Sequence, residues 1–540
     1  MKFEVRKCEQ LRMSNTITSP PSLKDITLPE IQRLLDAGAL TSTQLVHTYL
    51  ARINGVDHEF NSVIETNPDA ITDAQARDAE RAAGKKHSNL HGLPILLKDN
   101  IPTLDNTETT CGSLALIGAR PPEEATVVTA LHDAGAIILG KANMAEWVGF
   151  WSTSGCSGWS PRGGQTYGPY IKDSKASGSS SGSAVATALG LCFAAIGTET
   201  CWSIVSPAEK SGIVGYKPTK DLIPSDGIIY ASKKQDTVGM LTRTVEDAVL
   251  ITNALVAAIG GTELLRLLPE NTSSSDYADR ILDALRSKRS ITDLRSLRIA
   301  VPTAMLYCTP GFKLEAFGRA LWRLENNGAT VVNRVIIPGL CEYADLSQQE
   351  SQIVLDTDMK IAINDYLSNL RTNPQNINDL QDLIDFTKTC PEEGYPARNV
   401  AGLERAQATD LNSELYKAML KKDEHFAGCI SNALDRYSCD VLLIPFLSPV
   451  LQTFAAKAGS PVLSVPLSVY PEDTPVVIDS KNGLIIEASG LPISVFIFGR
   501  AHDDAEVLRV GAAIEKVMNV QERLVPYMLR ETDLSSVMGS

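Results

Sequence analysis

The sequence predicts an α/β fold built around a buried mixed sheet. Short apolar runs alternate with helical patterns, as in the strand-like Leu93–Leu97, a helix over Ala125–Ala134 and a strand over Ala136–Leu139. This alternation is typical of layered α/β proteins. Apolar strand patterns also return near the C-terminus. At 540 residues the chain is long enough to bury a large core without disulfide or metal staples.

The N-terminal part predicts two amphipathic helices over residues 25–54. Leu28, Ile31 and Leu34 form one apolar stripe, and a second stripe begins at Leu45. The threonines at 41 and 43 are candidate caps for the second helix. We expect residues 1–24 to form an N-terminal extension.

Residues 145–182 show little periodicity and contain many glycines and serines. A long irregular segment inside a compact domain is usually functional. Its aromatic residues are expected either to line an apolar pocket or, equally, to belong to the core; they are Trp147, Trp151, Trp159, Tyr167 and Tyr170.

In the second half of the chain, strand and helix patterns alternate less regularly. Residues 267–296 are polar and predict a surface loop plus a helix, and residues 312–435 predict a mostly helical insertion. The later strands are expected at Val441–Ile444, Val462–Val465, Val476–Ile478 and Ile493–Phe498, followed by a helix over Ala505–Val517. We assign residues 25–520 to a single domain and residues 521–540 to a C-terminal tail.

Composition excludes several function classes. The net charge of −14 argues against sequence-independent nucleic-acid binding, which relies on Lys and Arg. The N-terminus lacks the apolar run of a signal peptide, and no stretch approaches the ~18 apolar residues of a membrane span. The ten cysteines are scattered without a C-x-x-C pair, which favours reduced thiols over a zinc site. We therefore expect a cytoplasmic protein with no membrane span, metal or cofactor.

The candidate chemistry lies in two serine-containing segments. Ser177–Ser183 is a Gly/Ser loop that leads into an apolar helix over Ala184–Leu191, and Ser203 follows a buried strand. The pattern of a P-loop is absent, as is a G-x-S-x-G elbow. No histidine neighbours these serines, so a Ser-His-Asp triad would need long-range assembly. Lys98 ends an apolar run, where burial would depress its pKa and favour a neutral amine.

The order of these motifs resembles the amidase signature family. The resemblance covers roughly residues 25–520 and rests on several ordered motifs, which together are more specific than any one. They are Gly92-Leu93-Pro94 with Lys98-Asp99-Asn100, Thr109 to Ser113, the serine loop, Ile196 to Ile204, Gly212 to Thr219, Gln235-Asp236-Thr237, Arg243 to Ala248, Gly459-Ser460-Pro461 and Gly490-Leu491-Pro492. Trp159 with Arg162 to Thr166 looks most like the branch of peptide-amidase-like enzymes.

The resemblance implies a Ser–cis-Ser–Lys triad. Ser203 would be the nucleophile, Ser179 the bridging serine 24 positions earlier, and Lys98 the base. It also implies a cis peptide at Gly178–Ser179 and a supporting role for Ser180. Backbone amides of residues 200–203 would bind the oxyanion, namely those of Thr200, Cys201, Trp202 and Ser203. Thr153 and Ser154 align near a stretch that contacts substrate in the family.

One departure from the family lies directly before Ser203. Glycine-containing pairs are usual there, whereas this chain has Cys201-Trp202. Glycine permits a positive φ and close substrate approach, and Trp permits neither readily. Trp202 would narrow the acyl pocket, reshape the oxyanion turn or abolish hydrolysis. A packed thiol is favoured for Cys201 over a second nucleophile.

The resemblance further implies a largely parallel sheet between helical layers. The predicted function is that of a serine amidohydrolase or esterase that cleaves a small-molecule linear amide or ester through an acyl-enzyme, with a homodimer as a possible assembly. Two alternatives stay open. One is an acyl transferase or other biosynthetic enzyme on the same scaffold, and the other is a catalytically weak paralogue.

Overall fold

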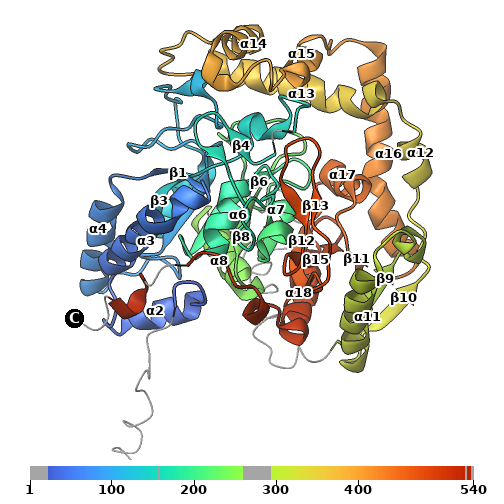
Figure 1. Ribbon diagram of the computed structural model, residues 1–540, viewed down its shortest axis with the longest axis horizontal. Coiled ribbons are helices and arrows are strands. Elements are labelled where there is room, and N and C mark those ends of the chain that lie inside the picture. Colours follow the sequence, from blue (N-terminus) through green and yellow to red (C-terminus); the bar gives the residue numbers. More distant parts are fainter. Residues whose placement is uncertain (1–21, 156, 260–293, 530–531, 537–540) are drawn as a thin grey trace, which may run out of the picture.

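The fold is organised by one eleven-stranded sheet (Figure 1). The computed structural model describes residues 22–155, 157–259, 294–529 and 532–536. The strands in spatial order are β1 (Val63–Thr66), β3 (Ile137–Ala142), β2 (Pro94–Lys98), β6 (Ala194–Glu199), β8 (Thr237–Thr242), β7 (Val214–Lys217), β12 (Val462–Val469), β15 (Pro492–Phe498), β11 (Val441–Ile444), β9 (Arg298–Val301) and β10 (Thr330–Asn333). Two small hairpins lie outside it, namely β4 (Trp159–Ser160) with β5 (Gly164–Gln165) and β13 (Val477–Ile478) with β14 (Ile485–Glu487).

The sheet is mixed, as predicted, but it is not largely parallel. Within the described residues, the parallel pairs are β3–β2, β2–β6, β11–β9 and β9–β10, and the other six neighbouring pairs are antiparallel. The reason lies in the connections. Antiparallel neighbours need no crossover helix, and residues 218–236 between β7 and β8 contain no helix, nor do residues 470–491 between β12 and β15.

Helices cover both faces of this sheet. On one face α6 packs against α7, and on the other α8 packs against α5 and α18. The central strands are buried along their whole length, as a sheet covered on both faces requires. The helices are α2 (Leu28–Asp36), α3 (Ser42–Val56), α4 (Ala70–Ala82), α5 (Thr126–Asp133), α6 (Ser181–Ala188), α7 (Val205–Ser211), α8 (Val245–Ile259), α11 (Gly311–Asn326), α12 (Leu340–Ala344), α13 (Gln348–Ser368), α14 (Leu380–Thr389), α15 (Ala401–Gln407), α16 (Glu414–Arg436), α17 (Pro449–Ala458) and α18 (Asp504–Met518).

Most of the predicted elements are confirmed. The two N-terminal helices are α2 and α3, and Thr41 caps α3 by accepting from the Gln44 N–H. The predicted C-terminal helix is α18. The prediction of a mostly helical 312–435 segment omitted β10, which pairs in parallel with β9 at the sheet edge. Strand β10 has only four residues and its two end residues are exposed, so its sequence shows little alternation of apolar and polar residues.

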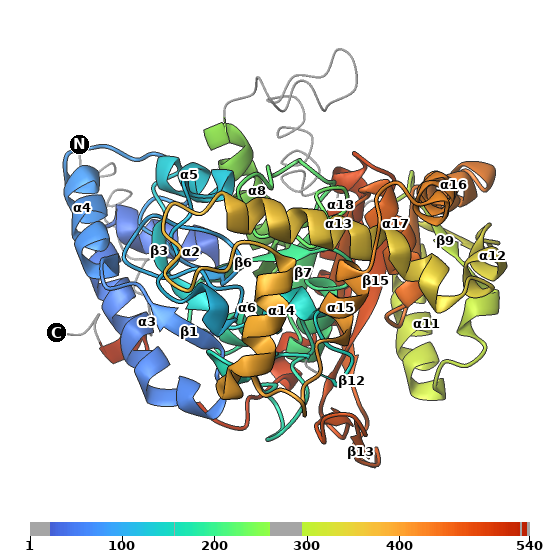
Figure 2. The same ribbon diagram turned by 90° about the horizontal axis from the view of Figure 1, so that it is seen from above.

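Helices α13, α14 and α15 form a cap across one end of the sheet (Figures 1 and 2). They pack on one another, and α13 also packs on α16. The predicted strand at 476–478 lies in the β13–β14 hairpin and not in the main sheet. The β13–β14 connection and the serine loop line the same cavity.

The predicted domain boundaries stay a prediction, and contacts join the first and last described segments to the core. Leu23, Leu524 and Leu534 are buried in the main apolar cluster. The Leu23 N–H donates to Asp533 Oδ1 at 2.6 Å. Of the predicted loop and helix at 267–296, residues 267–293 lie outside the described residues. In the part of the chain that the structure describes, no helix is long and apolar enough to cross a membrane.

Candidate active site

Two strand ends and two helix starts meet near the centre of the sheet. Lys98 ends β2, and its parallel neighbour β6 ends at Glu199. Helix α6 begins just after Ser179 and Ser180, and α7 begins just after Ser203. The carboxyl ends of adjacent parallel strands are where α/β proteins commonly bind ligands.

Lys98 is completely buried and surrounded by oxygen atoms. Its Nζ lies 2.7 Å from Ser179 Oγ, 2.9 Å from Thr198 Oγ1 and 3.0 Å from the Thr198 carbonyl. Burial lowers the pKa of Lys98 to about 7, although the neighbouring acidic groups Cys111, Asp236 and Glu199 oppose this shift. Near pH 7 the amine therefore exists partly in its neutral form, in which it can accept a proton.

The two serine segments are tied together through their backbones. The peptide bond Gly178–Ser179 is cis, which confirms that prediction. The Ser180 N–H donates to the Ser203 carbonyl at 3.0 Å, and the Ser180 hydroxyl donates to the Thr198 carbonyl at 3.2 Å. The Ser179 carbonyl accepts from the Ala145 N–H at 3.1 Å. These bonds hold the positions of Ser179 and Ser203 relative to each other.

Glu199 fixes the turn that contains Ser203. Its buried carboxylate accepts the N–H groups of Ile204 at 2.7 Å and Val205 at 3.1 Å, at the start of α7. A negative charge at a helix N-terminus is favourable. The carboxylate thereby anchors the chain immediately after Ser203.

Trp202 occupies a backbone conformation that favours glycine. Its φ is +56°, in the left-handed region that costs an ordinary L-residue roughly 1–2 kcal/mol. Val148 and Ser177, in neighbouring segments, also have positive φ values of 54° and 65°. Such strained residues cluster at functional sites.

Cys201 is buried, and burial raises the pKa of its thiol well above the usual value, which agrees with a packed thiol.

A cavity of about 360 Å³ opens beside these residues. Ser179, Trp202 and Ser203 line it. Phe150 and Val148 contribute apolar surface, while the rim is charged and contains the Lys175–Asp479 ion pair at 2.7 Å and Lys481. Asp479 and Lys481 belong to the β13–β14 connection, so this hairpin forms part of the cavity wall.

Thr153 and Ser154 lie at the junction between the cavity and the cap. Thr153 lines the cavity, whereas Ser154, like Thr200 and Cys201, is not among its described lining residues. Asn399, just before α15, contacts both, because its Nδ2 donates to Thr153 Oγ1 at 3.0 Å and to Ser154 Oγ at 2.6 Å. These hydrogen bonds connect the cap to the cavity wall.

Most aromatic residues of the irregular segment belong to the core, whereas Tyr167 is half-buried. Trp147 and Trp151 are buried in a second apolar cluster shared with the cap. Trp159 stacks on Trp151 with ring centroids 6.1 Å apart, and the Arg398 guanidinium lies 3.9 Å from its ring centroid. None of the five aromatic residues is among the described residues that line the cavity, where Phe150 supplies an aromatic surface instead.

Several polar residues of the site carried no sequence signal of their own. Asn100 donates to Thr198 Oγ1 at 3.1 Å and so orders the hydroxyl that contacts Lys98. Asp236 accepts from the Ala231 N–H at 2.7 Å and bonds the Thr200 side chain, and burial raises its pKa to about 6. Both residues lie within motifs quoted above, which is the signal that could have found them.

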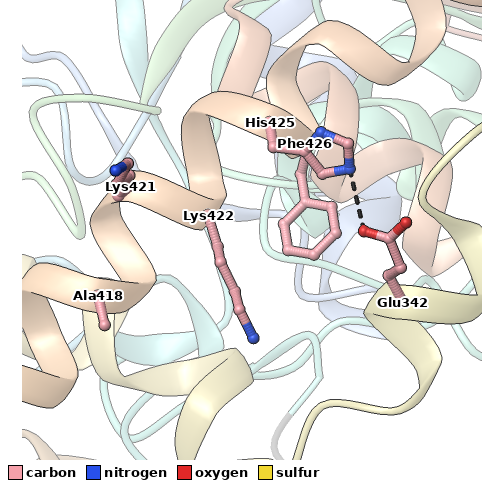
Figure 3. A pocket seen from close by; sticks show the side chains of 6 residues that line it. All are labelled: Glu342, Ala418, Lys421, Lys422, His425 and Phe426. Atoms are coloured by element: carbon pink, nitrogen blue, oxygen red, sulfur yellow. Dashed lines mark ion pairs between the residues drawn. The ribbon is translucent and has the colours of Figure 1, made fainter.

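A second pocket, of about 520 Å³, lies elsewhere, between α12 and α16. Figure 3 shows His425 paired with Glu342 near the Phe426 ring, with 3.1 Å between the paired atoms. Lys422 extends from the same helix, α16. None of the predicted site residues is among the residues described as lining it.

Comparison with known proteins identifies the family. The sequence profile of the family described as Amidase matches residues 44–508. The chain belongs to the amidase signature family. This confirms the resemblance inferred from the ordered motifs.

Relatives match this chain over nearly its full length. It is 34% identical to a protein of Arthroderma benhamiae named "Putative amidase", over 96% of this chain and 90% of that protein. It is 30% identical to a glutamyl-tRNA(Gln) amidotransferase subunit of Bacillus licheniformis, over 92% and 98% of the two chains. The crystal structure of peptide amidase from Stenotrophomonas maltophilia superposes with a TM-score of 0.79 at 33% identity, over 93% and 99%.

Proposed function

We propose that the protein hydrolyses a linear carboxamide through an acyl-enzyme, with Ser203 as nucleophile, Ser179 as bridging serine and Lys98 as base. The observation that carries this proposal is the contact between Lys98 Nζ and Ser179 Oγ, 2.7 Å apart at the buried end of β2. A lysine whose pKa is lowered to about 7 is suited to general base catalysis near neutral pH. Ser179 and Ser203 line the same cavity, which supports a relay between them.

The proposed steps conserve protons at each stage. The neutral Lys98 amine accepts the Ser179 hydroxyl proton while Ser179 accepts the proton of Ser203. The Ser203 oxygen then attacks the carbonyl carbon and forms a tetrahedral intermediate. The relay returns a proton to the leaving amine, and the C–N bond breaks. Water attacks the resulting ester by the same relay, which releases the carboxylic acid and restores Ser203.

The remaining predicted residues have supporting roles in this proposal. Backbone N–H groups of residues 200–203 bind the developing oxyanion, where one lost donor typically costs ~2.7–4 kcal/mol. Ser180 holds the two serine segments together through its bond to the Ser203 carbonyl. Thr153 contacts substrate at the cavity wall, and Ser154 holds that wall through Asn399.

The finer substrate class is also part of the proposal. The 33% identity to a peptide amidase supports peptide amides as the first substrates to test. An apolar cavity wall at Phe150 and Trp202 suits an apolar group next to the carbonyl. Measuring products with and without an added amine would separate hydrolysis from acyl transfer. The cytoplasmic location and the homodimer stay predictions, which fractionation and light scattering can test.

The direct test is covalent labelling with a fluorophosphonate probe. Intact-mass measurement should show one added probe on the wild-type protein, located at Ser203 by peptide mapping, and none on Ser203→Ala. The control is Ser211→Ala, which removes a buried hydroxyl without a described hydrogen-bond partner at the end of the same helix, α7. This variant should be labelled like the wild type. Equal labelling of Ser203→Ala, or no labelling of a folded wild-type protein, would refute the assignment.

A further inference from the structure

Three potential metal ligands meet before strand β2, at the end opposite Lys98. Glu80 lies in the last turn of α4, and His87 and His91 lie in the connection from α4 to β2. One ligand atom from each of the three lies within 4.8 Å of the others. Helix α4 packs beside α3 at the edge of the molecule (Figure 1). The proposed hydrolysis uses none of these groups.

His91 presents a buried nitrogen without a hydrogen-bond partner. Its side chain is 0% exposed, and its Nε2 lies 3.1 Å from the Arg77 carbonyl oxygen. A carbonyl only accepts, so Nε2 carries the hydrogen and Nδ1 of the neutral ring carries the lone pair. Nδ1 has no partner within the described residues. It faces Glu80 Oε2 at 4.0 Å, and two acceptors in this arrangement favour a cation between them.

His87 supplies a second nitrogen on the solvent side of the same carboxylate. Its Nε2 lies 3.3 Å from Glu80 Oε2, and its side chain is 37% exposed, so the ring has room to rotate. The rings of His87 and His91 lie 5.2 Å apart and are nearly parallel. Both must turn slightly for their nitrogens to reach one ion.

The backbone of Gly135 packs closely against His91. Gly135 has a φ of +81°, and a Cβ at this position would lie 2.6 Å from His91 Nδ1. A larger residue would therefore clash with the ring and displace the nitrogen. Positive charge also surrounds the cluster, because Arg77 donates to Glu80 Oε2 at 2.6 Å and Arg81 donates to the His91 carbonyl at 2.7 Å. An ion must share the Glu80 carboxylate with Arg77, which weakens binding.

We propose that Glu80, His87 and His91 bind a divalent first-row transition metal ion such as Zn²⁺. Two imidazoles and one carboxylate form a ligand set that zinc accepts, with bonds of about 2.0–2.2 Å and open positions for water. Ligand atoms of such a tetrahedral ion lie about 3.3 Å apart, so the spacing here needs only small side-chain adjustments. The His91 Nε2–H bond to the Arg77 carbonyl is the outer contact that metal-binding histidines usually make.

The ion would stabilise the fold and would not take part in amide cleavage. His91 precedes Lys98 by seven positions, and β2 lies between them. An extended strand rises about 3.3 Å per residue, so the two sites are separated by roughly 15–20 Å. The ion would join the end of α4 to the start of the central strand. This inference is independent of the proposed hydrolysis.

Calorimetric titration of ZnCl₂ into the chelator-treated full-length protein tests the site. We compare the wild type with His87→Ala, because His87 is exposed and its loss should leave the fold intact. The tightest dissociation constant should rise at least tenfold in His87→Ala. Zinc should also raise the Tm of the wild type but not of this variant. His132→Ala is the matched control, since His132 is a similarly exposed histidine 3.9 Å from Glu124, and it should bind like the wild type.

The exposed thiols Cys308 and Cys341 are the same in all three proteins, so the difference between isotherms reports the proposed site. Glu80→Gln provides a second test should His87→Ala misfold, and it should weaken zinc binding in the same way. Equal isotherms for the wild type and a folded ligand variant would overturn the proposal.

Discussion

The two ends of β2 hold buried nitrogen atoms in opposite situations. Lys98 Nζ has three oxygen partners within 3.0 Å, whereas His91 Nδ1, before the strand, has none within the described residues. Burial of Lys98 favours the neutral amine, and the Ser179 hydroxyl lies where that amine can accept its proton. A buried lone pair beside a carboxylate instead favours a bound cation. The comparison teaches that burial alone does not assign a role, because the partners of the buried atom decide it.

Of the substitutions considered, removal of the Lys98 amine should lower kcat/KM the most. Lys98→Met keeps the side-chain volume but removes the base, and we expect kcat/KM to fall by about 10²–10⁴-fold. The folding stability of Lys98→Met should not fall along with its activity. The pKa of Lys98 is lowered to about 7, so between that pH and its usual 10.5 the unfolded chain binds more protons than the folded chain. Stability therefore rises with pH across this window, and at pH 7 Met should be tolerated.

Lys141→Met is the matched control. Lys141 is also completely buried, burial lowers its pKa to about 8, and its Nζ donates to the Ile101 carbonyl and to Thr109 Oγ1. Its loss should change kcat/KM by less than about tenfold. Steady-state kinetics together with thermal unfolding measure both effects. Equal activity in the two variants would mean that Lys98 is only a structural lysine.

Replacing Trp202 should have an intermediate effect. Trp202 lines the cavity with a φ of +56°, so Trp202→Gly gives the substrate more room and relieves the backbone. We expect kcat/KM for small amides to rise roughly two- to tenfold. Trp202→Ala separates the two causes, because it creates the space but keeps the unfavourable φ. Lower turnover in both variants would show that Trp202 fits the native substrate.

Breaking the contact between the cap and the cavity wall should change the kinetic constants the least. Asn399→Ala removes the hydrogen bonds to Thr153 and Ser154, each worth about 0.5–1.5 kcal/mol. We expect KM to rise roughly two- to tenfold while kcat stays nearly constant. Asn378→Ala is the control, because Asn378 lies in the cap but bonds Asp382. A fall in kcat with unchanged KM would contradict this positioning role.

The sequence predicted the parts of the site that are local or carried by motifs. Lys98 at the end of an apolar run, the two serine segments and the cis Gly178–Ser179 bond all lie where the ordered motifs put them. The α/β class was also accessible, because the buried strand β11 is a continuous apolar run and β15 is apolar apart from Ser494.

What the sequence missed depends on long-range contacts. Asn399 lies 245 positions from Ser154, and no local pattern indicates their hydrogen bond. The sequence could not assign Trp147 and Trp151 to a pocket or to the core, because the residue type alone does not determine which residues a side chain packs against. The metal ligands were missed for the same reason, since His91 becomes informative only once Nδ1 is seen to be buried against Glu80.

The pH dependence of Ser203 acylation tests the central claim most directly. Rapid-quench measurement with an activated ester gives the rate of acyl-enzyme formation, separate from deacylation. The wild-type rate should rise about tenfold per pH unit below 7 and level off above it, as Lys98 loses its proton. In Lys98→Met the residual rate should lack this titration. A wild-type rate that is independent of pH between 5 and 8, or the same profile in Lys98→Met, would contradict Lys98 as the base.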